Sequence, residues 1–380
     1  MDFQLSEEQQ LFRRSVREFV DREVVPLAGS IDADGEFPLE TLRKLGDLGL
    51  TGLAIPVEYG GSGGDTIMVA IAIEEIARGC ASTSTVFAVT LSLCNQVIAA
   101  FGNEEQKRRY LPALSRAERI GCYGLTEPEA GSDAASLSTR ARREGDIYVV
   151  NGSKQFISNG DRADTMILFA TADPGLRTRG ISAFIVDTNQ PGFNVLKVEK
   201  KLGIRGSSTA ALSFDDLQVP AANRLGGEGD GFKIAMQVLD SSRIGIAAQA
   251  VGIGQAALEA AVDYARQRRQ FGRPIADNQA IQFMIADMRT RLEAARLLTW
   301  RAATMHDRKE KHSAESSIAK LFASEASEFI TSKAIQIHGG YGYLRDFPVE
   351  RYYRDARITQ IYEGTSEVQR IVIARDTLGR

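Results

Sequence analysis

Glu363 lies in the segment IYEGTSE at residues 361–367, where a carboxylate follows two apolar side chains and precedes a glycine. Burial beside those apolar neighbours would remove water from the carboxylate and raise its pKa toward that of a useful general base. Ser366 and Gln369 resemble a capping box, which predicts a helix starting near Ser366. The N-terminus of that helix would favour the carboxylate anion and oppose the rise. Glu363 is therefore a candidate base, with a solvated loop glutamate as the alternative.

The segment GCYGLTEPEAGSD at residues 121–133 is a second candidate site. It supplies hydroxyl groups, backbone N–H groups exposed by glycines, and a turn that a proline fixes. Such a loop can bind the polar edge of a heterocycle and a phosphate group. An interdomain turn is the alternative, and the segment alone does not decide between them.

Two glycine-rich segments have the form of nucleotide-binding motifs without the surroundings that such motifs need. Residues 252–257, GIGQAA, match the dinucleotide fingerprint G-x-G-x-x-A, and Asp277 lies at a suitable distance. The fingerprint requires a preceding strand, whereas residues 234–250 have a helical pattern. Residues 339–342, GGYG, also follow a predicted helix. Neither segment is predicted to be a Rossmann fingerprint, and we interpret the first as a helix packing face.

The composition argues against several other classes of protein. The 380 residues include 46 basic and 49 acidic side chains, for a formal net charge of −3 and a pI near 5.9. Nucleic acid is not expected as a partner, because binding its backbone needs a clustered basic excess. The arginines at 266–273 could still meet a small anion. Few cysteines and histidines are present, so no disulfide framework and no metal site are predicted. They are Cys80, Cys94, Cys122, His306, His312 and His338.

The length and the ends of the chain set broad limits. At ~150 residues per domain, the chain is long enough for two or three packing units. The N-terminal residues show no basic segment followed by an apolar one, and no uninterrupted apolar run approaches the ~20 residues of a membrane span. The protein is therefore predicted to be cytoplasmic.

Three regions of different periodicity must position the candidate segments. Residues 6–117 have a helical pattern, and Ser6 with Gln9 resembles a capping box at its start. Residues 121–216 contain short strands separated by turns, which indicates an antiparallel sandwich or small barrel. From residue 231 the pattern is helical again. We predict an α+β protein with an all-α domain at 1–118, a β domain at 119–230 and a helical bundle domain at 231–380.

Two local predictions refine this outline. Asn151-Gly152 lies between two strand-like runs and tolerates the positive φ of a type I′ turn, which predicts a hairpin over residues 147–157. Proline-free stretches predict long helices at 232–269, 278–305 and 313–337. A helix of ~28 residues spans ~42 Å, long enough for the side of a helical bundle.

Taken together, the two candidate segments resemble the acyl-CoA dehydrogenase family. TEPEAGSD at 126–133 and IYEGTSE at 361–367 are similar to its two most specific signatures, and the likeness extends over the chain to Arg380. Other segments resemble its short-chain (butyryl-CoA) branch: KLGIRGSSTA at 201–210, GFKIAMQ at 231–237, LTWRAA at 298–303 and RDARI at 354–358. The resemblance implies an N-terminal helical domain, a middle antiparallel β domain and a C-terminal four-helix bundle.

The resemblance also implies a reaction. It makes FAD the cofactor and Glu363 the base that takes the pro-R α-proton of a short-chain acyl-CoA, while flavin N5 accepts the β-hydride. The product is a trans-2-enoyl-CoA, and the electrons pass to an electron-transferring flavoprotein. A homotetramer (a dimer of dimers) and a place in fatty-acid β-oxidation are implied as well.

The resemblance assigns the other site residues one by one. The implied FAD contacts near the β domain and the Glu363 loop are Tyr123, Leu125, Thr126, Gly131, Ser132, Phe156, Ser158, Thr365 and Glu367. Those implied to reach the cofactor from a neighbouring subunit are Arg268, Gln270, Phe271, Asn278, Gln279 and the run Gln336 to Gly340, including Gly339. The implied acyl-CoA contacts are Ser132, Asp240, Ser242, Arg243, Tyr362 and Gly364.

A few positions depart from the family pattern. Phe156 and Ser158 stand where tryptophan and threonine are usual, which predicts altered ring packing and an altered flavin potential. Glu129 stands where glycine is common. Some branches carry the base on the bundle helix, at the position of Ser242; a serine cannot serve, so the base is assigned to Glu363.

Other functions stay open at this point. The substrate could be a branched or cyclic acyl-CoA, because the floor of the acyl pocket is not readable from one sequence. An acyl-CoA oxidase would differ in passing electrons to oxygen. A non-enzyme alternative is a catalytically silent CoA-binding or helical scaffold protein. Glu363, Thr126 and Ser132 argue against that last alternative.

Overall fold

The N-terminal part of the chain is a cluster of helices. The computed structural model describes residues 4–379, so Met1, Asp2 and Phe3, part of the terminus used to argue against a signal peptide, lie outside the described residues. The helices are α1 (Glu7–Glu23), α2 (Ala28–Asp34), α3 (Leu39–Asp47), α4 (Thr66–Gly79), α5 (Ala81–Ala88), α6 (Gln96–Phe101) and α7 (Glu104–Ser115). A π-helical segment, η3 (Val89–Asn95), joins α5 to α6. The predicted capping box at Ser6 and Gln9 is confirmed at the start of α1.

The middle of the chain forms a mixed sheet. Its strands are β1 (Gly121–Gly124), β2 (Arg140–Glu144), β3 (Ile147–Ser158), β4 (Thr165–Thr171), β5 (Ile181–Asp187), β6 (Phe193–Val198), β7 (Thr209–Pro220) and β8 (Arg224–Leu225). The order is β6-β7-β3-β2-β4-β5-β8, and β1 pairs with β4. The predicted antiparallel pairing is confirmed for most neighbours, but β4 pairs in parallel with β1 and β2. A parallel pair needs a long crossover, which the chain between β1 and β4 supplies here.

The hairpin turn predicted at Asn151-Gly152 is wrong. Residues 147–158 form the single long strand β3, which pairs with β2 on one side and β7 on the other. The turn between β2 and β3 lies earlier, at Gly145-Asp146, where Gly145 has a positive φ of 61°. An Asn-Gly pair signals a turn only where the chain is free to reverse, and pairing with β7 keeps it extended here.

Asn151 and Gly152 lie instead at an irregularity of the sheet, where the register between β3 and β7 shifts. The side chain of Asn151 donates to Asp216 Oδ1 and accepts from the Asp216 N–H, each at 2.9 Å, at a shift in register between β3 and β7. A Cβ on Gly152 would lie 2.7 Å from Thr139 Cα. Glycine is therefore required at this position because two backbones approach closely.

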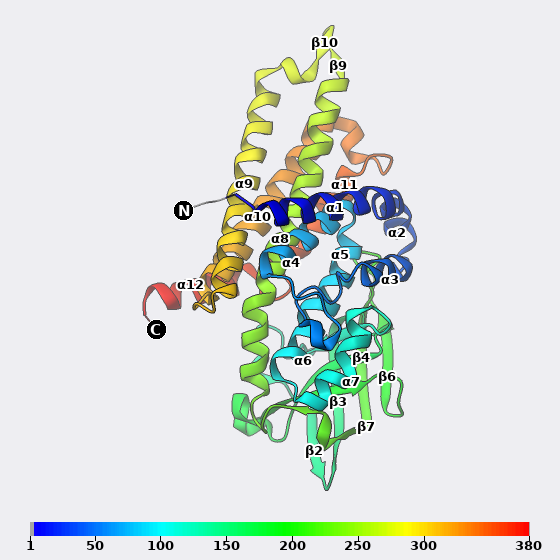
Figure 1. Ribbon diagram of the computed structural model, residues 1–380. Coiled ribbons are helices and arrows are strands. Elements are labelled where there is room, and N and C mark those ends of the chain that lie inside the picture. Colours follow the sequence, from blue (N-terminus) through cyan, green and yellow to red (C-terminus); the bar gives the residue numbers. More distant parts are fainter. Residues whose placement is uncertain (1–3, 380) are drawn as a thin grey trace.

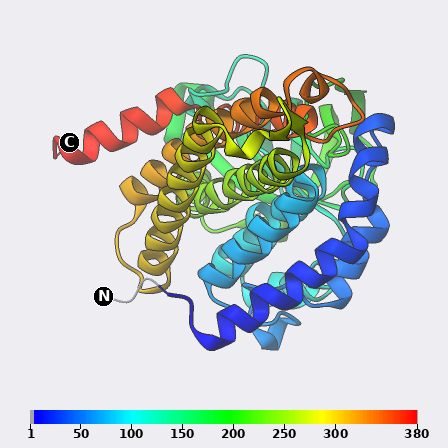
Figure 2. The same ribbon diagram turned by 90° about the horizontal axis from the view of Figure 1, so that it is seen from above.

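The C-terminal part of the chain is helical, as predicted. It contains α8 (Gly231–Gln267), α9 (Gln279–Asp307), α10 (Ser313–His338), α11 (Val349–Ala356) and α12 (Ser366–Thr377), with a small ribbon of β9 (Arg269–Gln270) and β10 (Arg273–Pro274). The three long helices start and end within two residues of their predicted bounds. α8 runs from the sheet at one end of the molecule to the β9–β10 ribbon at the other (Figure 1). α12 projects from the side of the bundle (Figure 2).

The GIGQAA segment lies inside α8, where no strand precedes it. A Cβ on Gly252 would lie 2.2 Å from the Glu74 carbonyl oxygen of α4. The interpretation of this segment as a packing face is therefore confirmed. The close approach that Gly252 permits fastens the N-terminal helices to the C-terminal bundle.

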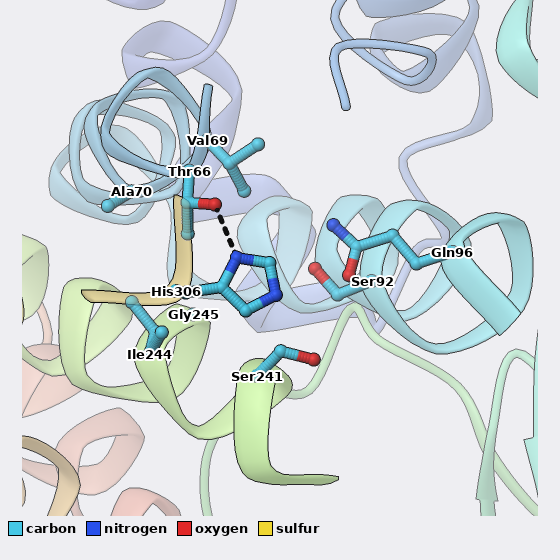
Figure 3. A pocket seen from close by; sticks show the side chains of 9 residues that line it. All are labelled: Thr66, Val69, Ala70, Ser92, Gln96, Ser241, Ile244, Gly245 and His306. Carbon is cyan, nitrogen blue, oxygen red and sulfur yellow. Dashed lines mark hydrogen bonds between the residues drawn. The ribbon is translucent and has the colours of Figure 1, made fainter. Parts of the chain in front are cut away.

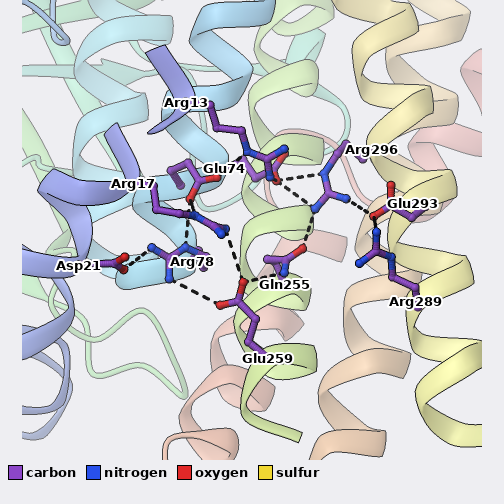
Figure 4. Close-up of polar contacts among 11 residues, drawn as sticks. Arg13, Arg17, Asp21, Glu74, Arg78, Gln255, Glu259, Arg289, Glu293 and Arg296 are labelled. Atoms are coloured by element: carbon purple, nitrogen blue, oxygen red, sulfur yellow. Dashed lines mark hydrogen bonds and ion pairs between the residues drawn. The ribbon is translucent and has the colours of Figure 1, made fainter. Parts of the chain in front are cut away.

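Buried charges reinforce the same junction (Figure 4). The α4 carboxylates Glu74 and Glu75 are almost fully buried. Glu74 pairs with Arg13 of α1 at 2.8 Å and with Arg296 of α9 at 3.0 Å. Glu75 pairs with Arg13 and with Arg17 of α1, at 2.8 and 2.9 Å. Glu75 also pairs with Arg78 of its own helix at 3.0 Å. Each buried carboxylate thus has at least two guanidinium partners, which compensates for its lost hydration and joins α1, α4 and α9.

Within residues 4–379, two helical stretches are long and apolar enough to cross a bilayer if length and composition alone are considered. They are Ala81–Phe101 and Gly231–Gln267. Within the protein, 72% of the most apolar window of the first and 83% of that of the second are buried. Core helices of water-soluble proteins have the same character, so these stretches are weak support for a membrane span.

Candidate active site

Glu363 lies on the loop between α11 and α12, in an unusual backbone conformation. Its φ is 51°, and the φ of the following Gly364 is 92°. The left-handed region is uncommon for a residue with a side chain and persists only where the surroundings hold it. Two helices, α12 and α10, hold this loop from either side.

α12 holds the loop from its C-terminal side. The N-cap of the helix is Thr365, whose hydroxyl accepts a hydrogen bond from the Val368 N–H. The predicted capping box of Ser366 with Gln369 is therefore wrong by one residue, because Ser366 is already helical. Gln369 is fully buried and donates from Nε2 to the Gly364 carbonyl at 2.8 Å. The loop is thus tied to the first turn of α12.

α10 holds the loop from the other side through a lysine. Lys320 has no exposed surface, and its Nζ donates to the Tyr362 carbonyl at 2.8 Å and to the Gly364 carbonyl. These two carbonyls flank Glu363 in the chain. One ammonium group therefore contacts the backbone on both sides of the candidate base.

The carboxylate of Glu363 is poorly solvated. Its Oε2 is buried and has no hydrogen-bond partner among the described residues. Burial raises the pKa of Glu363, and the Ser242 hydroxyl, Lys320 and Arg243 oppose the rise only in part. The backbone N–H of Glu363 also donates no hydrogen bond within residues 4–379. A base with a raised pKa beside a free N–H donor is suited to removing a proton next to a carbonyl group.

Three of the implied acyl-CoA contacts lie on one turn of α8 beside this loop. Arg243 is buried and donates to Asp240 at 2.7 Å and to Ser317 at 3.4 Å, while its Nε has no partner among the described residues. Burial lowers the pKa of Arg243, and the Asp240 and Glu363 carboxylates oppose that change. The structure thus brings together Asp240, Ser242, Arg243, Tyr362, Glu363 and Gly364.

A small cavity adjoins this turn of α8 without reaching the Glu363 loop (Figure 3). Its lining comes from α4, η3, α6, α8 and α9: Thr66, Val69, Ala70, Ser92, Gln96, Ser241, Ile244, Gly245 and His306. Thr66 Oγ1 and His306 Nδ1 are hydrogen-bonded at 2.9 Å. The candidate catalytic group and this cavity are therefore separate features.

Tyr362 enters a buried chain of hydrogen bonds behind the loop. Its hydroxyl donates to Gln249 Oε1 on α8, and Gln249 Nε2 donates to Thr85 Oγ1 on α5 at 2.8 Å. Burial and the nearby Glu363 carboxylate raise the pKa of Tyr362, so the phenol stays neutral. This chain links the loop to both α5 and α8.

The segment at 121–133 starts as β1 and continues as a loop held by a buried ion pair. Glu127 and Lys154 are 3% and 0% exposed, and their charged atoms lie 2.8 Å apart. Lys154 also donates to the Leu125 carbonyl at 3.0 Å, and the Gln155 N–H donates to the Thr126 carbonyl at 2.9 Å. The loop is therefore fixed to β3 rather than acting as a free interdomain turn.

One face of this loop and of β3 fits a planar aromatic cofactor with phosphate groups. Phe156 is 64% exposed and has a φ of 60°, and Ser158 ends the same strand. A Cβ on Gly131 would meet no atom within 4 Å, and Ser132 beside it is exposed. An exposed ring, hydroxyl groups and open backbone are what an isoalloxazine and a pyrophosphate require.

Tyr123 links this face to the Glu363 loop. Its ring contacts Phe169 with centroids 4.9 Å apart, and its buried hydroxyl has no partner among the described residues. Burial raises the pKa of Tyr123, and the Glu363 carboxylate raises it further. The candidate base and the candidate cofactor face are therefore neighbours within one chain.

The remaining implied cofactor contacts lie elsewhere. They gather at the end of α8 farthest from the sheet and comprise Arg268, Gln270, Phe271, Asn278, Gln279, Gln336, Gly339 and Gly340 (Figure 1). Phe271 is fully exposed, and the Arg268 guanidinium lies over the Tyr341 ring at 5.4 Å. Thr365 and the exposed Glu367 start α12 instead. Within one chain, the distal group is not brought to Glu363.

Sequence reasoning gave no role to several residues that shape the site. Lys320, Gln249 and Lys154 are buried polar groups that contact the candidate loops. The sequence pattern could have predicted that Lys320 is buried, because it lies at helical spacing from small residues that face the core, such as Ser316, Ser324 and Ser327. A lysine on such a face has no water and must find partners in the protein.

Sequence models of three protein-family domains match almost the entire chain. The acyl-CoA dehydrogenase N-terminal domain matches residues 6–118, the middle domain 122–217 and the C-terminal domain 229–378. Together they cover the helical, β and helical regions in the order in which the structure shows them.

Individual relatives agree with this assignment. The chain is 49% identical over 374 residues to the short-chain specific acyl-CoA dehydrogenase of Clostridium acetobutylicum, covering 98% of this chain and 99% of that protein. Butyryl-CoA dehydrogenase from Megasphaera elsdenii superimposes with a TM-score of 0.98 at 44% identity, over 100% of both chains. A chain in the structure of the electron transferring flavoprotein of Acidaminococcus fermentans does so with a TM-score of 0.98 at 46% identity, over 100% of both chains. The chain belongs to the acyl-CoA dehydrogenase family of FAD-dependent oxidoreductases that act on CH–CH groups.

Proposed function

We propose that this protein oxidises a short-chain acyl-CoA to the trans-2-enoyl-CoA, with Glu363 as the catalytic base. The observation that carries the proposal is the state of Glu363. One oxygen of its carboxylate is buried and has no partner among the described residues, and its backbone N–H is free within residues 4–379. Both groups lie on a loop close to Tyr123, which belongs to the candidate cofactor-binding segment at 121–133. The similarity to a short-chain specific dehydrogenase and to butyryl-CoA dehydrogenase supports a substrate with a short acyl chain.

Two groups of Glu363, its carboxylate and its backbone N–H, would perform different parts of the reaction. The α-C–H of a thioester is a weak acid, so the base must be strong and the charge that develops on the thioester oxygen must be stabilised. The Glu363 carboxylate takes the α-proton, and burial strengthens it as a base by raising its pKa. The Glu363 N–H is available to donate to the thioester oxygen. FAD, when bound, supplies the acceptor for the two electrons that leave with the β-hydrogen.

The other site residues would bind and orient the two ligands. For FAD we propose Tyr123, Leu125, Thr126, Gly131, Ser132, Phe156, Ser158, Thr365 and Glu367 in one chain. For the acyl-CoA we propose Ser132, Asp240, Ser242, Arg243, Tyr362 and Gly364. Arg243 suits this role because its Nε is buried without a partner and can donate to an oxygen of the substrate.

A second subunit would complete the cofactor site. The distal group around Phe271 is exposed and lies too far from Glu363 to act within its own chain, which supports a homotetramer in which it reaches a neighbour's FAD. We further propose an electron-transferring flavoprotein as the acceptor, supported by the similarity to a chain in such a protein's structure. A cytoplasmic location, and domains at 1–118, 119–230 and 231–380, complete the proposal.

The experiment that tests the base is the substitution Glu363→Gln in the purified holoenzyme. The amide keeps the shape of the side chain but cannot accept the α-proton, so anaerobic butyryl-CoA should no longer bleach the bound flavin. The flavin content and the melting temperature should stay at the wild-type level. Absorbance titration and thermal unfolding measure these quantities.

Glu129→Gln is a matched control, because Glu129 is an exposed carboxylate in the other signature. Butyryl-CoA should bleach the flavin of this variant at the wild-type rate. Full bleaching by Glu363→Gln would exclude Glu363 as the base. A panel of linear, branched and cyclic acyl-CoAs defines the substrate, and rapid peroxide formation in air without an electron-transferring flavoprotein would instead indicate an oxidase.

A further inference from the structure

Lys320 is an unusual group to find at the centre of a helical bundle. It is fully buried on α10, a helix whose other buried residues are small or apolar apart from His338 at its C-terminal end. A buried ammonium group is costly unless its donors are satisfied. Among residues 4–379 Lys320 forms no ion pair, and its hydrogen-bond partners are two backbone carbonyls.

Both partners belong to the loop that carries Glu363. Nζ donates to the Tyr362 carbonyl at 2.8 Å and to the Gly364 carbonyl, the residues immediately before and after the base. The backbone between them is left-handed, with φ values of 51° at Glu363 and 92° at Gly364. The carbonyls of Tyr362 and Gly364 can both reach one cation only where the chain turns tightly between them. An uncommon φ for a glutamate is thus held by a contact outside the loop.

We propose that Lys320 is a positioning residue of the dehydrogenation: its ammonium group clamps the carbonyls on both sides of Glu363 and keeps the base and its free N–H in the reactive arrangement. This inference rests on the proposed function of Glu363. It adds a residue on another helix that acts only through the loop and never touches the substrate.

The charge of Lys320 gives it a second, measurable effect on the base. Burial lowers the pKa of Lys320 to about 8, against the opposing pull of Glu363, so the amine is still protonated at neutral pH. Its cation in turn lowers the pKa of Glu363. The other titratable groups that face this pair are Arg243 of α8, Tyr123 of β1, and Tyr362 and Glu367 of the loop and α12. Among them Arg243 is the only other cation.

The test compares Lys320→Met with Lys311→Met in the FAD-loaded enzyme. Methionine replaces the apolar stem of the lysine but has no donor and no charge. Lys311 is an exposed lysine that pairs with Asp376 at the surface, so its loss should leave activity unchanged. Both variants are assayed for flavin content, for the anaerobic rate of flavin reduction by butyryl-CoA across a pH series, and for hydrogen exchange of the peptide that covers residues 361–368.

The Lys320→Met enzyme should retain FAD. Its flavin should be reduced by butyryl-CoA about 100-fold more slowly, because misplacing a catalytic group such as Glu363 by about 1 Å has an effect of that size. The acid limb of its pH profile should move up by about 1 pH unit or more, because the carboxylate has lost a nearby cation. Exchange should accelerate in residues 361–368 and remain unchanged in the sheet. A merely structural role would change exchange throughout the bundle and leave the acid limb in place.

The opposite results overturn the proposal. A folded Lys320→Met enzyme with the wild-type acid limb and wild-type exchange at 361–368 excludes the clamp, whatever its rate. If that variant yields no folded holoenzyme, Lys320→Gln carries the test: an amide keeps donors without the charge, so loop exchange should stay near wild type while the acid limb still moves up. An unmoved acid limb in Lys320→Gln overturns the proposal.

Failure of the inference and failure of the proposed function are distinguishable. If butyryl-CoA and the other acyl-CoAs fail to reduce the flavin of the wild-type enzyme, the proposed function is wrong. The exchange measurement needs no substrate, so the comparison of Lys320→Met with Lys311→Met at residues 361–368 still decides whether Lys320 holds the loop.

Discussion

The ion pair of Glu127 and Lys154 shows how a buried charge can hold a binding loop. Glu127 accepts hydrogen bonds from Lys154 Nζ, from the Ser138 N–H and hydroxyl, and from the Thr139 N–H. Burial by itself would raise the pKa of Glu127, but Lys154 and these hydrogen bonds lower it to about 2. The signature residue Glu127 therefore acts on the conformation of the loop that also carries Thr126 and Ser132, two of the proposed FAD contacts.

Glu127→Ala should destabilise the protein by about 3–5 kcal/mol, because it leaves the Lys154 ammonium buried without its partner. Urea unfolding at neutral pH measures the loss. The exposed neighbour supplies the control: Glu129→Ala should change the free energy of unfolding by less than about 0.5 kcal/mol. Equal stabilities for the two variants would contradict this account.

The same pair predicts a pH dependence with a definite sign. Because the folded pKa of Glu127 is depressed to about 2, its contribution to stability is present above the ordinary value of 4.5 and is lost as pH falls from there toward about 2. Over that range the wild type should lose more stability than Glu127→Ala. Parallel stability curves for both proteins would show that Glu127 is not the responsible carboxylate.

At the scale of elements, the predictions that depended on long uninterrupted patterns were the reliable ones. α8, α9 and α10 were predicted from their periodicity and lack of proline because helix hydrogen bonds are local. The Asn151-Gly152 turn was wrong because strand pairing is not local: the β3 backbone is paired with β7, some 60 residues later in the chain, and this overrides the turn preference. The predicted N-cap of α12, Ser366, was also wrong, and Thr365 is the N-cap. The side chain of Gln369 forms no capping box with Ser366 because it donates to the Gly364 carbonyl of the loop.

Gly252→Ala tests the packing of α8 on α4. The added Cβ would lie 2.2 Å from the Glu74 carbonyl, so the helices must move apart, at a cost of about 1–3 kcal/mol. Gly254→Ala is the matched control, because its Cβ would meet the ends of the Ile330 and Leu292 side chains at 3.3 Å, which can adjust. Its greater helix propensity should make that variant neutral or slightly more stable. Thermal unfolding distinguishes the two, and a stable Gly252→Ala would contradict the close packing.

For the whole molecule, the distribution of exposed apolar side chains indicates where a neighbour belongs. Phe271, Tyr341, Tyr343 and Leu344 are all exposed at the end of the bundle farthest from the sheet. Exposed aromatic groups that cluster in this way mark contact surfaces. This end also carries the residues assigned to a neighbouring subunit's cofactor, so assembly and cofactor binding should be coupled.

Phe271→Asp should therefore weaken the proposed homotetramer and release FAD together. Because the side chain is fully exposed in one chain, the helical content and fold of the subunit should be retained. Light scattering after size exclusion gives the mass, and flavin absorbance gives the cofactor content. Val57→Asp, at an exposed valine of the N-terminal helical region, is the control and should stay assembled. A tetramer of Phe271→Asp with full FAD would remove this residue from the proposed interface.

The order of residues was enough to predict which segments could do chemistry and in what order helical and β regions follow. Those properties are local: a glutamate in IYEGTSE, a hydroxyl-rich loop in TEPEAGSD, and periodicities of 3.6 and 2 are written in neighbouring residues. The surroundings of Glu363, by contrast, became visible in the folded chain alone. Burial raises its pKa because α8, α10 and β1 converge on one loop, and Lys320 meets the loop carbonyls because a long helix carries it there. Desolvation and through-space charge depend on distance, which residue order does not specify.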